Sequence, residues 1–400
     1  MTGRKNDDQT SLRLKPATRI VTGGRDPMAH HGFVNPPVYH ASTVLYASAE
    51  DLVAHRSRYQ YGRLATPTSE ALTEALRELE GPLCAGVALM PSGLSAISTA
   101  LLSVVKTGDH ILVADTIYRP TRNVCDTVLA RLGVTTTYYD PLIGDGIAAL
   151  FQPNTRAIFT EAPGSQSFEM QDIPAIAEIA HRHGAVVLMD NTWATPLFFD
   201  AFGKGVDLSI QAGTKYLGGH SDLMIGTVSA NESTWKALRD TTLLLGICVG
   251  PDDIYLAQRG LRTLDVRLRR HHQSGLHVAR WLAERPEVAR VMHPGLENDP
   301  GHRIWKRDFT GASGLFSIEL QPTPEPAVFA FLDALRLFGM GFSWGGYESL
   351  VILFDCAEYR TATTWYANGP TLRFHIGLED VDDLIADLDQ GFAAMKLALP

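Results

Sequence analysis

Residues 212–222, Ala-Gly-Thr-Lys-Tyr-Leu-Gly-Gly-His-Ser-Asp, follow the apolar run Val206–Gln211 and contain the residue that indicates the fold, Lys215. The apolar run alternates and is rich enough in β-branched residues to predict a buried strand. Lys215 therefore lies just past a strand end, among small residues and hydroxyls. A desolvated lysine can lose its proton, and the free amine can attack a carbonyl to form a Schiff base.

A second predicted strand end carries a carboxylate. The apolar run Ala185–Met189 is followed by Asp190-Asn191-Thr192. This pair suits pyridoxal phosphate, because a lysine can hold the aldehyde while an aspartate keeps the pyridine nitrogen protonated. Taken alone, such a lysine is usually a solvated loop residue, and such an aspartate an ordinary strand-to-turn signal. The two together, within a repeated strand–helix pattern, favour a site.

Short apolar segments alternate with helical segments through the middle of the chain. This rhythm predicts an α/β fold with a mostly parallel central sheet flanked by helices. Ligands of such folds bind beyond the carboxyl ends of the strands, where Ser92, Asp190 and Lys215 all fall. The predicted strands are 87–90, 111–114, 157–160, 186–189, 208–211 and 224–228, and the predicted helices include 94–105 and 173–183.

The chain divides into three predicted regions. Residues 1–63 form an N-terminal arm, with a loose tail over 1–12 and an extended, Gly- and Pro-rich part over 18–43 that we expect to lie on another surface. Residues 64–255 form the large cofactor-binding domain, and residues 256–400 form a smaller C-terminal α/β domain. In the latter we expect a long helical stretch over 256–282, strands over 315–320, 350–354 and 371–376, and a final helix from about Val381 to Met395.

Composition narrows the class of protein. The 400 residues carry a formal net charge of −9, with 45% hydrophobic residues, which is typical of a soluble globular protein without a nucleic-acid role. The basic stretch 262–272 has helical spacing and is interpreted as a solvated helix face. Neither a membrane-spanning run nor a signal peptide is evident. The four widely separated cysteines favour a reducing, cytoplasmic location, and neither cysteines nor histidines have metal-site spacing.

Several further residues are candidates for binding an anion. Pro91-Ser92-Gly93-Leu94 begins a predicted helix, where free N–H groups and the helix dipole favour a phosphate. Thr214 can add a hydroxyl, and Tyr61-Gly62-Arg63 supplies a phenol and a guanidinium. The signal at Ser92 is weak by itself. The absence of the GxxxxGK[ST] and GxGxxG motifs counts against an NTPase or a Rossmann dehydrogenase.

Two residues fit other roles. Tyr118 follows a predicted strand and could stack on a flat ring, although a tyrosine capping the edge of the core is an equal alternative. Arg373 lies inside an otherwise apolar strand and needs a partner. A substrate α-carboxylate would satisfy its guanidinium bidentately, and a structural ion pair with an acidic side chain is the competing interpretation.

Together these residues closely resemble the Cys/Met-metabolism family of pyridoxal-phosphate enzymes over about residues 18–395. The most specific motif is Thr214-Lys215-Tyr216-Leu217 with the Gly-His-Ser-Asp that follows it. The other matching motifs are Val34-Asn35-Pro36-Pro37-Val38, Tyr61-Gly62-Arg63, Ser92-Gly93, Asp190-Asn191-Thr192, Arg373 and Gly377-Leu378-Glu379-Asp380. One departure is Ala212, since many members carry a serine three residues before the lysine.

The resemblance implies fold type I, the aminotransferase-like fold, and a homotetramer built from dimers. It implies that Lys215 holds the cofactor and later removes the Cα proton, that Asp190 holds the pyridine nitrogen, and that Tyr118 acts in catalysis and cofactor binding. Ser92, Gly93, Leu94 and Thr214 are implied to bind the cofactor, as are Tyr61 and Arg63 of a neighbouring subunit. Arg373, Ser343, Trp344 and Tyr61 are implied to bind substrate.

Two stretches resemble the β-lyase branch of the family. Pro163-Gly164-Ser165 stands where γ-enzymes typically carry Pro-Thr-Asn-Pro, and Trp344, within 343–350, stands where they usually carry a leucine. This branch implies a carbon–sulfur lyase of methionine biosynthesis that cleaves cystathionine by β-elimination to homocysteine, pyruvate and ammonia. The alternatives are a γ-synthase, a γ-lyase or a cysteine desulfhydrase using the same site, or a non-catalytic protein that binds pyridoxal phosphate.

Overall fold

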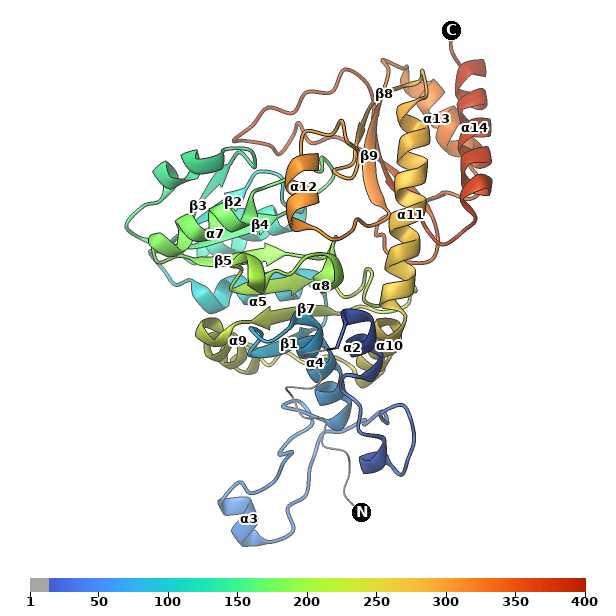
Figure 1. Cartoon of the computed structure of the whole chain (residues 1–400). Coiled ribbons are helices and arrows are strands. Elements are labelled where there is room, and N and C mark those ends of the chain that lie inside the picture. The colour runs from blue at the N-terminus through green and yellow to red at the C-terminus, as the bar shows by residue number, and fades with distance from the viewer. Residues whose placement is uncertain (1–13) are drawn as a thin grey trace.

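The structure of the chain, a computed structural model, describes residues 14–400 and contains two β-sheets (Figure 1). The larger sheet has seven strands in the order β1-β7-β6-β5-β4-β2-β3, and the smaller has five in the order β10-β11-β12-β9-β8. Helices flank both sheets, as predicted for an α/β protein.

Strand direction in the larger sheet gathers the strand ends at one edge. Neighbours from β6 to β3 are parallel, whereas β7 is antiparallel to both β6 and β1. The two reversals cancel, so β1 points the same way as β6, and every strand except β7 has its carboxyl end at the same edge. The strands are β1 (Gly86–Met90), β2 (His110–Ala114), β3 (Thr135–Tyr139), β4 (Thr155–Glu161), β5 (Val186–Asp190), β6 (Leu208–Gln211) and β7 (Gly226–Ala230).

Four helices of this part, α4, α5, α7 and α9, begin at residues whose side chains satisfy a free backbone N–H group. The side chains of Thr66, Ser92, Asp172 and Asn231 each accept a hydrogen bond from the backbone three residues on. The helices are α4 (Pro67–Glu80), α5 (Gly93–Val104), α6 (Arg119–Asn123), α7 (Ile173–Arg182), α8 (Thr195–Phe198), α9 (Glu232–Leu244) and α10 (Pro251–Arg262), with shorter turns η2 (Val124–Leu129), η3 (Gly144–Leu150) and η4 (Phe202–Lys204).

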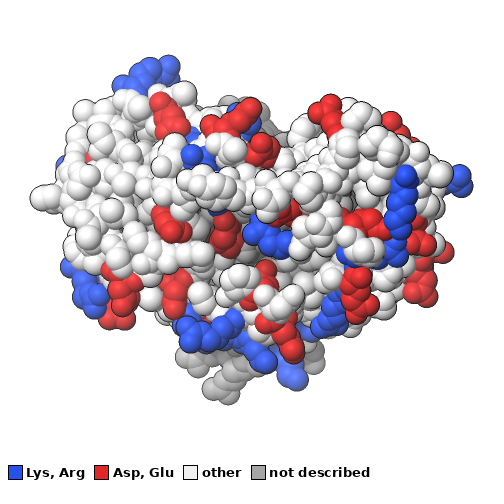
Figure 2. Space-filling view, turned by 90° about the horizontal axis from the view of Figure 1, so that it is seen from above, with Lys and Arg blue, Asp and Glu red and all other residues white. Residues whose placement is uncertain are grey.

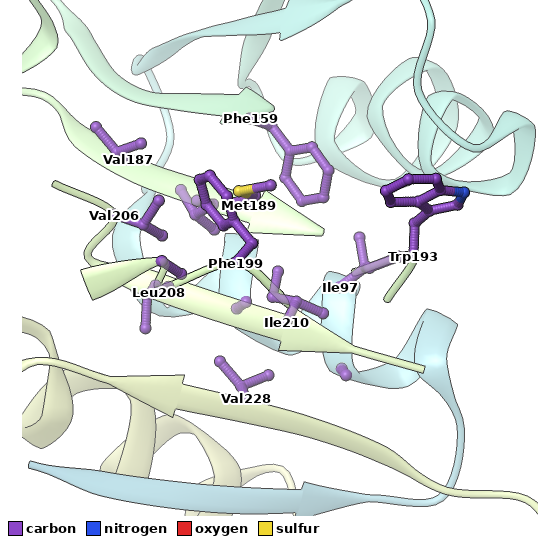
Figure 3. Close-up of a cluster of buried hydrophobic side chains, with 14 of the residues drawn as sticks. Ile97, Phe159, Val187, Met189, Trp193, Phe199, Val206, Leu208, Ile210 and Val228 are labelled. Atoms are coloured by element: carbon purple, nitrogen blue, oxygen red, sulfur yellow. The ribbon is translucent and has the colours of Figure 1, made fainter. Parts of the chain in front are cut away.

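Apolar side chains from neighbouring strands and α5 form the main core (Figure 3). Phe159 of β4, Met189 of β5 and Ile210 of β6 are each at most 1% exposed. Because helices cover the sheet, the middle residues of the parallel strands β4 and β5 are apolar. Their polar residues are therefore concentrated at their ends, where the site forms.

The smaller sheet belongs to the C-terminal part of the chain. Helices α11, α13 and α14 pack together along it, and a second buried cluster lies between them and the sheet (Figure 1). The elements are α11 (Leu264–Ala283), β8 (Val288–Met292), α12 (His302–Asp308), β9 (Leu315–Leu320), α13 (Glu325–Ala334), β10 (Gly339–Met340), β11 (Leu350–Phe354), β12 (Thr371–His375) and α14 (Val381–Leu397).

The proposed boundary at residue 255 falls inside α10. Core residues change from the first cluster to the second within α11, between Leu268 and Leu276. The division into 64–255 and 256–400 remains a proposal.

The predicted strands are present, with ends that differ by at most two residues. Three strands, β3, β8 and β10, were not predicted, because they contain few buried apolar residues: β3 is Thr-Thr-Thr-Tyr-Tyr with one buried residue, and the two residues of β10 are exposed. The predicted long helical stretch over 256–282 is helical, but it is divided into α10 and α11 at Thr263.

The arm differs from the prediction at its start. Residues 16–22 form the helix α2 (Pro16–Thr22), which packs on α4 and α10 and buries Ile20 to 1% exposure. The expectation of an extended conformation is therefore wrong for this part, although the segment does lie on another surface, that of α4 and α10. The following segment, with η1 (Pro27–His30) and α3 (Ala49–Val53), projects from the body (Figure 1). The predicted loose tail over 1–12 lies outside the described residues.

The basic stretch 262–272 is only partly a solvated face. Arg267 is 6% exposed and donates to the carbonyl oxygens of Tyr216 and Gly260, both at 2.8 Å. Arg262 donates to the carbonyls of Ile20 (2.7 Å) and Gly23 (2.8 Å). Both side chains satisfy carbonyl groups of other segments, and helical spacing alone could not reveal those acceptors.

Charges of both signs are interspersed on the face of the molecule in Figure 2, without a broad basic area among its described residues. Within residues 14–400, no helix combines the length and the apolar composition needed to cross a bilayer.

Glu80, the last residue of α4, is a buried carboxyl group that makes stability depend on pH. It is 6% exposed, and burial raises its pKa to about 8. The folded state therefore favours the protonated form of Glu80. The stability that protonation of Glu80 contributes is fully present below the unfolded pKa of about 4.3, and it is lost as pH rises through about 8. Glu80→Gln should raise the melting temperature by a few degrees at pH 9 and by less at pH 5. Thermal unfolding at both pH values, with the exposed Glu74→Gln as control, measures this difference; an equal shift at both would contradict it.

Candidate active site

The carboxyl edge of the larger sheet brings together polar residues that are far apart in sequence. Asp190 ends β5, Glu161 ends β4 beside it, and Lys215 follows β6. Ser92 follows β1, and Tyr118 follows β2. The structure thus confirms that Ser92, Asp190 and Lys215 share one edge of the sheet.

Lys215 is held by the C-terminal part of the chain. Its Nζ donates to Ser343 Oγ at 2.5 Å and lies 5.4 Å from the centre of the Trp344 ring. Burial and the nearby Arg373 guanidinium lower the pKa of Lys215 to about 8, and Asp190 opposes this. An amine with this pKa is partly unprotonated near neutral pH, which a nucleophile or a general base requires.

Asp190 is oriented by Thr192. The Thr192 backbone N–H and hydroxyl both donate to Asp190 Oδ1, at 3.0 and 2.5 Å, and the Thr192 hydroxyl accepts the N–H of Ala212 at 2.9 Å. Burial raises the pKa of Asp190, while Thr192 and the Lys215 charge favour its ionised form. Among the described residues no hydrogen bond reaches Oδ2, so this oxygen is free to hold a protonated ring nitrogen. Thr192 was within a quoted motif, but its orienting role was not predicted.

The first turn of α5 offers a place for a phosphate. Ser92 caps the helix through its hydroxyl, which accepts the N–H of Ser95 at 3.1 Å. A Cβ on Gly93 would lie 2.5 Å from the Cβ of Ala212, so only glycine allows this close approach. Ala212 therefore packs against the turn instead of offering a hydroxyl. The remaining N–H groups at this end, those of Gly93 and Leu94, are the donors that suit an anion.

Thr214 is partly committed to its own loop. Its hydroxyl accepts the N–H of Ile225 at 3.1 Å and lies 3.2 Å from the Ile225 carbonyl oxygen, to which it can donate. Because a hydroxyl has one hydrogen, binding a phosphate as a donor requires it to turn away from that carbonyl.

Tyr118 and Glu161 form a pair that the sequence did not suggest. The backbone N–H of Tyr118 donates to Glu161 Oε2 at 2.7 Å. Burial and the neighbouring Asp190 raise the pKa of Glu161 well above its ordinary value. The Tyr118 side chain is 45% exposed, and burial, Asp190 and Glu161 raise the pKa of its hydroxyl. Glu161 follows an apolar strand much as Asp190 does, and that position was the available signal.

Arg373 lies on β12 of the smaller sheet and approaches the same edge. Its Nη2 donates to the carbonyl oxygen of Ser343 at 3.2 Å. Among the described residues no carboxylate forms an ion pair with it. Burial lowers the pKa of Arg373 to about 10, so it remains charged at neutral pH. The structure thus favours an unpaired donor that can take a carboxylate over the structural ion pair.

Tyr61 and Arg63 lie elsewhere in this subunit. Tyr61 is 46% exposed and forms an isolated bridge with Thr43. Arg63 donates to the carbonyl oxygen of Leu243 at 3.0 Å and lines a cavity of about 560 Å³ between the arm, α9 and α10. Lys215 does not line this cavity. A role of the two residues at a phosphate stays a prediction that needs a second subunit.

The donor set of this edge fits pyridoxal phosphate. Lys215 can hold an aldehyde, Asp190 Oδ2 a protonated ring nitrogen, and the N-terminus of α5 a phosphate. A mostly parallel sheet with such a site defines a pyridoxal-phosphate-dependent enzyme of fold type I. The chain belongs to the Cys/Met metabolism PLP-dependent enzyme family, whose pattern matches residues 17–393.

Relatives with high identity are named cystathionine β-lyases. The enzyme of Escherichia coli is 46% identical over 388 residues, and that of Salmonella typhimurium is 47% identical over 388 residues. Each comparison covers 94% of this chain and 98% of the relative. A solved cystathionine γ-lyase from Lactobacillus plantarum, in complex with L-serine, has a TM-score of 0.88 at 29% identity and covers 96% of this chain and all of its own.

Proposed function

We infer that the chain is a pyridoxal-phosphate-dependent carbon–sulfur lyase that cleaves cystathionine by β-elimination to homocysteine, pyruvate and ammonia. The observation that carries this inference is Lys215: a half-buried amine with a lowered pKa, near Asp190 and Arg373, in a chain that is 46–47% identical to cystathionine β-lyases. The γ-cleaving alternative has weaker support, because the γ-lyase neighbour is 29% identical.

The cofactor, when bound, supplies an electron sink that accepts the electrons left when the Cα proton departs. Lys215 would hold its aldehyde and would remove the Cα proton as a free amine. Ser343 Oγ, 2.5 Å from Nζ, would keep that amine in position. Arg373 would bind the substrate carboxylate through its guanidinium fork. Trp344 would line the substrate side, because its ring lies beside Lys215.

The direct test of activity is the release of products from cystathionine. Purified protein with added cofactor should release thiol, keto acid and ammonia in equimolar amounts. A protein that binds the cofactor without turnover would release none of them, and the inference would then fail.

We also propose that the enzyme is a homotetramer built from dimers, and that it acts in the cytoplasm. Support for assembly comes from the projecting arm, which exposes several apolar side chains that a monomer would seldom leave uncovered. These side chains include those of Met28, Phe33, Val34, Leu45 and Val53, which are 61–87% exposed. Support for the compartment comes from the four cysteines, all of which are free thiols.

Shared active sites would follow from this assembly, with Arg63 and Tyr61 of one subunit acting at Lys215 of another. Arg63→Ala and Lys215→Ala subunits, each nearly inactive alone, should regain a fraction of activity when co-assembled. In a mixed dimer one site would then receive an intact Lys215 from one chain and an intact Arg63 from the other. Absence of recovery in verified mixed oligomers would mean that Arg63 acts within its own subunit or contributes little.

A further inference from the structure

The loop 343–346 is pressed against the backbone of Lys215. Gly345 has φ +88, and a Cβ there would lie 2.8 Å from the Lys215 carbonyl carbon. Ser343 has φ 96, which is unusual for a residue with a side chain. The same residue accepts from Lys215 through Oγ and from Arg373 through its carbonyl oxygen. The loop thus needs something to keep it in this uncommon conformation.

His375 provides that contact. Its Nε2 accepts the backbone N–H of Gly345 at 3.1 Å. The Gly346 carbonyl oxygen lies 3.2 Å from the same nitrogen. One ring nitrogen cannot accept and donate at once, so the bond from Gly345 forms in the tautomer whose Nε2 carries no hydrogen. In that tautomer the ring hydrogen lies on Nδ1, which has no hydrogen-bond partner among the described residues. His375 lies two residues after Arg373 on β12, so both side chains point to the same side of the strand.

The surroundings of His375 keep the ring neutral. It is 1% exposed and packs against Tyr216 and against His271 of α11, with ring centres 5.9 and 5.2 Å away. Burial lowers the pKa of His375 well below its ordinary value, and the charges of Lys215 and Arg373 act in the same direction. An uncharged ring therefore accepts the Gly345 N–H throughout the neutral pH range.

We propose that His375 is a positioning residue for the lyase reaction: by accepting the Gly345 N–H, it fixes the loop 343–346 and so sets Ser343 on the Lys215 amine. The proposal rests on the proposed roles of Lys215 and Ser343. It gives a chemical reason for histidine at 375, because the position requires a neutral acceptor at the distance of Nε2 from the strand backbone.

Two substitutions test whether residue 375 must accept the Gly345 N–H or need only be polar. His375→Gln carries its carboxamide near the position of Nε2 and can still accept from Gly345, whereas His375→Asn is one carbon shorter and cannot reach it. We expect H375N to reduce kcat for cystathionine by at least about tenfold. Loss of the Gly345 contact should release the loop, and the Lys215 amine should then lose its positioning hydrogen bond to Ser343. H375Q should stay within a few-fold of the parent enzyme. Cofactor content, measured by absorbance, should be equal in all three proteins.

Two further variants exclude a general loss of stability. His293 is also buried and its Nδ1 accepts a backbone N–H, that of Gly295 at 2.9 Å, outside the loop 343–346. H293L should destabilise the protein without lowering kcat. If H375N does not fold, H375L takes its place, since leucine also removes the acceptor of the Gly345 N–H but brings no polar group of its own into the core.

A double variant tests the route of the effect. If His375 acts through Ser343, H375N combined with S343A should cost little more than the more damaging single change. The proposal is overturned if the two losses multiply, if H375Q is as slow as H375N, or if H293L lowers kcat equally. Activity that persists in K215A would instead overturn the proposed role of Lys215, so the two failures are distinguishable.

Discussion

Lys215→Ala should reduce the release of pyruvate from cystathionine by at least about a thousandfold. The change removes the amine that holds the cofactor aldehyde and also the proposed base, and a positioned base alone contributes about 10²–10⁴-fold. The half-buried position of Lys215 and its lowered pKa of about 8 are the physical grounds for this expectation. The measurement is turnover by continuous keto-acid detection in the presence of added cofactor.

Borohydride reduction followed by peptide mapping gives an independent check. The parent protein should be labelled at Lys215, and the variant should carry no label. The exposed Lys236, whose ammonium pairs with Asp240, serves as a control because Lys236→Ala should keep both label and turnover. Labelling of a different lysine in the parent protein would contradict the assignment.

Arg373→Ala should reduce kcat/KM by at least about tenfold while leaving the cofactor absorbance in place. A hydrogen bond to a charged group contributes about 1.5–3 kcal/mol, which corresponds to about 10–150-fold. Arg373 is half-buried, and the one hydrogen bond found for its guanidinium among the described residues goes to the Ser343 carbonyl, which leaves donors for a substrate carboxylate. Steady-state kinetics with cystathionine measures the effect.

Arg373→Lys serves as the matched variant. It keeps the charge but loses the planar fork, so its kcat/KM should fall between those of the parent and the alanine variant. Thermal unfolding separates the substrate-binding role of Arg373 from a structural role. Replacement of Arg267, which donates to backbone carbonyls, should lower the melting temperature more than it changes the kinetics. Unchanged kcat/KM in Arg373→Ala would contradict the substrate-binding role and would favour a structural role for Arg373.

The sequence predicted the arrangement of the site wherever chain order determines position. Parallel strands place their carboxyl ends at one edge, so Asp190 after β5 and Lys215 after β6 could be brought together from the order of segments alone. The hydrogen bonds within that edge could not be predicted in the same way. Glu161 accepts from Tyr118, which lies on another segment, and nothing in the local sequence of either residue indicates the pairing.

Contacts between the two parts of the chain were likewise beyond prediction. The position of Ser343 at the Lys215 amine depends on how the smaller sheet packs against the larger one, as does the buried contact of Arg267 with Tyr216. The arm shows the same limit, since α2 is short and only its packing against α4 and α10 stabilises it. The roles proposed for Tyr61 and Arg63 at a phosphate require a second subunit, so the structure of a single chain does not test them.

The identity of the keto acid formed from cystathionine tests the central claim most directly. Cleavage at Cβ leaves a three-carbon fragment and cleavage at Cγ a four-carbon one, so chromatography with authentic standards separates the two outcomes. The account predicts pyruvate as the product, formed together with homocysteine, and its loss in Lys215→Ala. Formation of 2-oxobutyrate with cysteine as the main products would contradict it.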